Sequence, residues 1–173
     1  MDQGIAGLVG AAVGGLIGVA GTLGAARLTG KDQRRNQHEY WRRQQRRDAY
    51  SQLVMQASEA LRLGTNAQDA FEARDPSSAA LSEQFSEVVH RLGEAESLVA
   101  LEGPEEASNE AGELITELYT WANSLNFAVA TREGQVSLPS EWSVSLSELV
   151  DHRDRSHEAV ATFTVHCRRL LDS

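Results

Sequence analysis

The sequence predicts an all-α protein, with an N-terminal transmembrane helix followed by a cytosolic four-helix bundle. Three observations lead to this fold class. Residues 4–26 are uncharged and rich in glycine, residues 31–47 are dense in Lys and Arg, and the rest repeats apolar residues at three- and four-residue steps. The chain therefore divides into a transmembrane helix at 1–30, a basic juxtamembrane collar at 31–47 and an acidic helical-bundle domain at 48–173.

The uncharged stretch is long enough to cross a bilayer. As a helix, Gly4 to Ala26 measures about 34 Å, against about 30 Å for the hydrocarbon core. A secretory signal peptide is the alternative, but it needs a positive start, and Met1–Gln3 carries an acid instead. The basic residues that follow place residues 31–173 in the cytoplasm and the N-terminus outside. We therefore expect a single-pass protein of the inner (plasma) membrane, and the lone Cys167 agrees with a reducing compartment.

Glycines repeat along one side of the predicted span. Two overlapping GxxxG steps and a seven-residue repeat leave this side without side chains, while the bulky apolar residues lie elsewhere. Such a face lets helix backbones approach closely, so we expect a glycine zipper that drives homo-oligomerisation. Several packed spans could open a narrow pore by rotation or tilt, gated by a hydrophobic constriction. The expected oligomerisation residues are Gly7, Gly10, Gly14, Gly18 and Gly21.

The collar is the strongest polar signal. It carries seven Lys or Arg against two acids, whereas residues 48–173 carry eight against twenty-two. Lipid head groups attract such side chains by about 1 kcal/mol each, and aromatic residues favour the interface. A ring of arginines in an oligomer would also suit a single-stranded oligonucleotide, because guanidinium binds phosphate bidentately and aromatics stack on bases. A protein partner is the third possibility. The expected anion- or lipid-binding residues are Arg34, Arg35, Trp41, Arg42, Arg43, Arg46 and Arg47.

Local signals place four helices after the span. The first continues from Lys31 to Leu63 or further, and Gly64–Asn66 either ends or bends it. The second begins at Asp75–Ser77 and stops at Gly103. The third begins at Pro104 and stops at the turn 131–134, and the last begins at Pro139.

Each of the last three helices carries one apolar stripe, which together with short connections predicts a bundle. Arg153 and Ser156 interrupt the last stripe. Three interpretations stay open: a satisfied polar layer, a subunit contact or an ion pair with an acid. The stripes are Leu81, Phe85, Val88, Leu92, Ala95 and Val99; Ala107, Ala111, Leu114, Leu118, Trp121 and Leu125; and Trp142, Leu146, Leu149, Val160, Phe163, Cys167 and Leu170.

The sequence offers no catalytic constellation, so we expect no enzyme, cofactor or metal. Glu87-x-x-His90 and Asp154-x-x-His157 each resemble half of a di-iron motif. Helical projection turns three of these side chains away from the core and leaves His157 without a second ligand. Cys167 lies on a core stripe, where it serves as a small hydrophobe rather than a nucleophile.

The layout of a glycine-rich span, an Arg/Trp-rich collar and a small helical domain resembles single-pass membrane effectors of actinobacterial anti-phage defence, the Hailong-type effectors. The resemblance covers the whole chain as architecture and transfers no residue role. It implies an oligomeric channel held in check by DNA oligomers that a partner nucleotidyltransferase makes, with the collar as the place of contact. We therefore expect a homo-oligomeric effector that forms a gated pore controlled by a cytosolic ligand. The alternative is a membrane-anchored scaffold that recruits a cytosolic protein partner.

Overall fold

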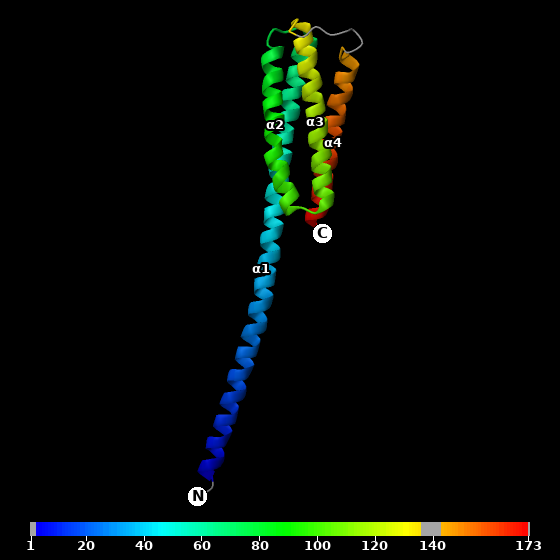
Figure 1. Cartoon of the computed structure of the whole chain (residues 1–173). Helices are drawn as coiled ribbons and strands as arrows, with labels where there is room; N and C mark the ends of the chain where they lie inside the picture. The colour runs from blue at the N-terminus through cyan, green and yellow to red at the C-terminus, as the bar shows by residue number, and fades with distance from the viewer. Residues whose placement is uncertain (1–2, 136–142, 173) are drawn as a thin grey trace. The chain divides into compact units, whose positions relative to one another are not determined.

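The computed structural model describes the backbone of residues 3–135 and 143–172, and the side chains of residues 37, 39–135 and 143–172. In this part the chain is all-helical and has no strand, as predicted. The helices are α1 (Gln3–Glu72), α2 (Ser78–Glu102), α3 (Glu105–Arg132) and α4 (Leu146–Asp172). The chain divides into two compact units, Met1–Arg43 and Gln44–Ser173. In the second unit, α2, α3, α4 and the later part of α1 lie side by side as a four-helix bundle (Figure 1).

The bundle has one continuous core to which all four helices contribute. Its largest fully buried side chains include Tyr50 of α1, Phe85 of α2, Trp121 of α3 and Phe163 of α4. The predicted stripe of α3 is buried at all six positions. In α2 the buried face is rotated slightly, because Val89 is fully buried while its predicted neighbours Leu81 and Val88 are only half-buried. The apolar pattern therefore located the core well, with an error of about one residue in α2.

Helix α1 continues through Gly64–Asn66 to Glu72, so it runs beyond Leu63 and these residues do not end it. Gly64 lies against two aromatic rings of the core. A Cβ at this position would sit 2.5 Å from Cζ3 of Trp121 and 2.8 Å from Cζ of Phe85. The glycine is therefore a contact point that admits two large rings, and the helix tolerates its lower propensity.

The connections on both sides of α2 agree with the predicted signals. Before α2, the Asp75 carboxylate accepts the backbone N–H of Ser77 at 2.8 Å, and Ser77 is the N-cap residue. After α2, Gly103 donates its N–H to the carbonyl of Val99 at 2.8 Å, and Pro104 caps the start of α3. The predicted starts and stops at these positions are confirmed.

The end of α3 is also confirmed, but the start of α4 differs from the prediction. Beyond Arg132, Gly134 adopts a left-handed conformation with φ of 72°, as a turn requires. Residues 143–145 are not helical and α4 begins at Leu146, so the predicted continuous helix from Pro139 is wrong. Pro139 and Trp142 themselves lie outside the described residues.

A capping box sets the start of α4. The backbone N–H of Ser145 donates to Oε2 of Glu148 at 2.7 Å, and the backbone N–H of Glu148 donates to Oγ of Ser145 at 3.2 Å. Leu146, predicted on the apolar stripe, is 54% exposed because it occupies the first position of the helix. The remaining described stripe residues of α4 are buried or packed against the core.

One buried and one exposed polar contact fix how the helices meet. Nε1 of Trp121 donates to Oε1 of Gln68 at 2.9 Å, and Gln68 in turn donates to Glu72 at 2.9 Å. At the same end of the bundle, Arg132 donates to the carbonyl of Phe71 and stacks 3.6 Å from the centre of its ring. These contacts tie α1 to α3.

Among the residues whose side chains are described, no helix is long and apolar enough to cross a membrane. The predicted span at 4–26 lies outside that set, and so do Arg34, Arg35 and the expected oligomerisation glycines.

Candidate functional site

The predicted collar is split between the two units. In the first unit, Tyr40 is 73% and Trp41 54% exposed, and Arg42 and Arg43 are exposed as well. Large exposed aromatics beside exposed arginines are the side chains that a lipid interface or a nucleic-acid strand can use.

In the second unit, Arg46 differs from its exposed neighbour Arg47. Its side chain is half-buried, and its Nε donates to the backbone carbonyl of Glu102 at 2.8 Å. Glu102 is the last residue of α2, where carbonyls lack partners within the helix and a cation is favourable. One arginine of the expected anion-binding set therefore contacts the bundle itself.

Tyr50 follows one turn later and lies in the core. It is 2% exposed, and its ring meets Phe163 of α4 edge to face with centroids 6.2 Å apart. Its hydroxyl has no hydrogen-bond partner among the described residues. Burial raises the pKa of Tyr50, the nearby Cys167 raises it further, and Arg46 opposes the shift. A neutral tyrosine thus joins α1 to α4 immediately beside the Arg46 contact.

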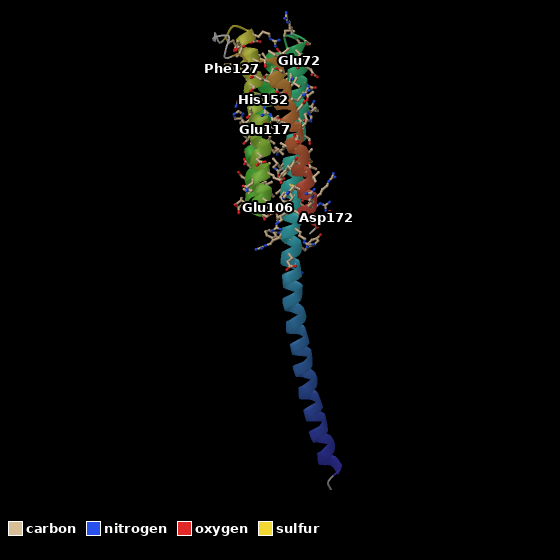
Figure 2. All side chains as sticks on the ribbon, turned by 90° about the vertical axis from the view of Figure 1, so that its right-hand side faces the viewer. Glu72, Glu106, Glu117, Phe127, His152 and Asp172 are labelled. Atoms are coloured by element: carbon tan, nitrogen blue, oxygen red, sulfur yellow. The ribbon has the colours of Figure 1, made fainter. Side chains whose placement is uncertain are left out.

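A groove of about 720 Å³ lies over α3 and α4, with one side chain from α2. Figure 2 shows α3 alongside α4, with Glu117 on α3 and His152 on α4 labelled. Ile115, Ala159 and Phe163 give the groove an apolar part. Its charged residues are Glu96, Glu110, Glu113, Glu117 and Glu158, with Arg155 as the single cation.

Two side-chain contacts cross between α3 and α4 at this groove. Nε of Arg155 lies 3.9 Å from Oε2 of Glu117, in a partly exposed and therefore weak pair. Nδ1 of His166 lies 2.9 Å from Oε1 of Glu110, with both side chains mostly buried. The surplus of carboxylates suits a cationic partner and repels a polyanion.

The structure places the predicted metal-motif residues on the surface. Glu87, His90, Asp154 and His157 are all exposed, as expected from helical projection. Within the described residues, no group of three or more His, Cys, Asp or Glu side chains could hold a metal ion.

Cys167 is buried, and burial followed by the charge of Glu110 raises its pKa to about 12. The thiolate needed for nucleophilic attack is therefore scarce at neutral pH.

Two polar residues interrupt the α4 stripe between Leu149 and Val160. Ser156 is buried and donates to its own helix at the His152 carbonyl, while Arg153 pairs with the adjacent Asp154 at 3.2 Å.

Sequence reasoning missed the groove, the contact of Arg46 with the Glu102 carbonyl and the contact of His166 with Glu110. The acidic spacing of Glu110, Glu113 and Glu117 indicates a charged face of α3 and was available from the sequence. The pairings of Arg46 with Glu102 and of His166 with Glu110 were not, because they depend on how the helices align along the bundle.

Comparison with known proteins finds no matching family model, no matching curated protein and no matching solved structure.

Proposed function

We propose that the chain is a homo-oligomeric, single-pass membrane effector whose glycine-rich helix assembles a gated pore in the inner membrane. The observation that carries the proposal is the uncharged stretch 4–26, with glycines at four- and seven-residue spacing on one side. The helical bundle is cytoplasmic and controls opening in response to a ligand. Such a protein would act in anti-phage defence by depolarising the infected cell.

The ligand that fits the exposed collar is an anion that carries phosphate. Arg42, Arg43 and Arg47 are exposed, and Trp41 offers a ring for stacking. A lipid head group or a single-stranded oligonucleotide meets both requirements. The groove over α3 and α4 does not suit such a ligand, because glutamates dominate its charge.

The proposal is tested by expressing the full chain in bacteria and following membrane potential with a dye. Gly14→Leu with Gly18→Leu fills the bare face and should abolish depolarisation. Val9→Leu with Val13→Leu adds bulk to the other side of the same helix and should leave depolarisation intact. Both double variants must be recovered in the membrane fraction at equal amounts.

Equal depolarisation by the two double variants would contradict a pore built on the glycine face. Absence of depolarisation by the unaltered chain, with and without phage infection, would contradict the effector role as a whole.

A membrane-anchored scaffold is the second candidate, and the groove favours it. An apolar floor beside five glutamates suits a partner segment that carries Lys or Arg and a few apolar residues. In that case Glu113→Lys with Glu117→Lys should lose a cross-linked cytosolic partner while the chain stays in the membrane. Recovery of the same partner by this variant would contradict the scaffold.

A further inference from the structure

The contact between Arg46 and the end of α2 holds the α2–α3 connection against α1. The connection is short, since α2 ends at Glu102 and α3 begins at Glu105. Its carbonyl at Glu102 accepts the hydrogen bond from Nε of Arg46 at 2.8 Å. Arg46 belongs to the basic segment 31–47 and is half-buried, unlike the exposed Arg47.

Tyr50 extends the same contact into the core. A Cβ on Gly103 would sit 3.0 Å from the Tyr50 hydroxyl, so the connection packs directly on this side chain. The ring of Tyr50 meets Phe163 of α4. Gly103 joins α2 to α3, and Tyr50 belongs to α1 and meets α4. Displacement of the connection at Gly103 would therefore disturb the packing of all four helices around this one buried tyrosine.

The hydrogen bond of Arg46 can be replaced by a stronger one. The recorded bond uses Nε alone and a neutral carbonyl as acceptor. A guanidinium carries five N–H donors in a fork that matches phosphate, and charged bidentate pairs are stronger than a single bond to a neutral acceptor. A phosphate at the collar is thus a competitor for Arg46.

We propose that Arg46 is a positioning residue that switches between the Glu102 carbonyl and a phosphate of the ligand, and so releases the α2–α3 connection from α1 when the ligand binds. This proposal rests on the proposed function, in which the basic segment receives a phosphate-bearing ligand. The phosphate can belong to a lipid head group or to a free oligonucleotide, and the experiment separates these sources.

The test is hydrogen exchange of the full chain, read at peptides that contain Gly103 and the first turn of α3. The amide of Gly103 is bonded to Val99, and those of Ala107 and Ser108 are bonded to Pro104. The chain is studied in maltoside detergent micelles, which carry no phosphate, in the same micelles with added phosphatidylglycerol, and in the micelles with short single-stranded DNA. Arg46→Gln is compared with the unaltered chain and with Arg47→Gln, which removes the same charge one residue away.

Without ligand, Arg46→Gln should raise the exchange rate at Gly103 roughly tenfold, as expected for the loss of one charged hydrogen bond, and Arg47→Gln should not. One of the two phosphate sources should raise the rate in the unaltered chain and in Arg47→Gln, with no further rise in Arg46→Gln. If Arg46 were purely structural, the ligand would change the exchange rate at Gly103 equally with and without the Arg46 side chain. Circular dichroism checks that Arg46→Gln remains helical, and Arg46→Lys, which keeps the charge without the fork, should restore less than half of the ligand effect.

Three results would overturn the switch alone. The first is an unchanged rate at Gly103 in Arg46→Gln, and the second is a ligand effect that persists in that variant. The third is ligand binding, followed by DNA fluorescence anisotropy or by a shift of Trp41 emission, without any change at Gly103. This last result would leave the proposed function standing, whereas a chain that binds neither phosphate source would overturn the phosphate ligand and the switch together.

Discussion

Gly64 marks the place where α1 comes closest to the aromatic core. Trp121 and Phe85 pack edge to face with centroids 4.8 Å apart, and both rings reach the bare Cα side of Gly64. Trp121 cannot simply move away, because it is fully buried and donates to Gln68 at 2.9 Å. Because Gly64 carries only a hydrogen atom where alanine would carry a methyl group, α1 can lie this close to the rings on α2 and α3.

Gly64→Ala should destabilise the protein although alanine is the better helix former. The higher helix propensity of alanine stabilises the folded state by about 1 kcal/mol, but overpacking against a fixed tryptophan destabilises it by about 1–3 kcal/mol. Gly93→Ala is the matched control, since a Cβ there meets nothing within 4 Å, and it should stabilise. Urea denaturation of both variants measures the difference, and equal stabilisation by both would contradict the contact at Gly64.

Cys167 should react with thiol reagents only after unfolding. With its pKa raised to about 12, the native thiol at pH 8 should react about a thousandfold more slowly than in urea, judged by thiolate fraction alone. The raised pKa means that the native state favours the neutral thiol. Stability should therefore fall as pH rises above the ordinary value of 9.0. Rapid native labelling by Ellman's reagent, followed by absorbance, would contradict this burial.

At the scale of the helices, the sequence was most informative where apolar spacing and capping signals agreed. All six predicted members of the α3 stripe from Ala107 to Leu125 are buried, because they point to the same side of a helix that Pro104 starts. Gly64 was ambiguous because a glycine that ends a helix and one that admits a ring look alike in sequence. The predicted start of α4 at Pro139 is wrong, because the capping box between Ser145 and Glu148 sets the start.

The capping box of α4 makes part of its stability dependent on pH. Hydrogen bonds from the backbone and side chain of Ser145 lower the pKa of the Glu148 carboxyl below its ordinary value of 4.5. A lowered pKa favours the folded state above that ordinary value, and the contribution disappears as pH falls through the lowered one. Glu148→Gln should therefore lower stability at pH 7 and have little effect near pH 2.

Glu94→Gln is the control for this prediction, because it removes the same charge from an exposed site on α2. Thermal unfolding at both pH values compares the two variants. An equal effect of the two variants at pH 7 would show that Glu148 acts only through net charge.

At the scale of the whole molecule, the sequence predicted the bundle but not the groove on its surface. The acidic balance of residues 48–173 is visible in the composition, yet the groove appears only when α3 and α4 are aligned. The same holds for Arg46, which the charge pattern grouped with the anion-binding arginines and which the fold directs to Glu102. Contacts between helices depend on three-dimensional register, which local periodicity does not specify.

The proposed pore depends on one claim, that the glycine face assembles the chain, and its most direct test is the native mass of the full-length protein in detergent. We expect a defined oligomer of at least three copies for the unaltered chain and for Val9→Leu with Val13→Leu. Gly14→Leu with Gly18→Leu should shift the mass to smaller species. A monomer or dimer for the unaltered chain, or the same oligomer in all three proteins, would contradict the claim.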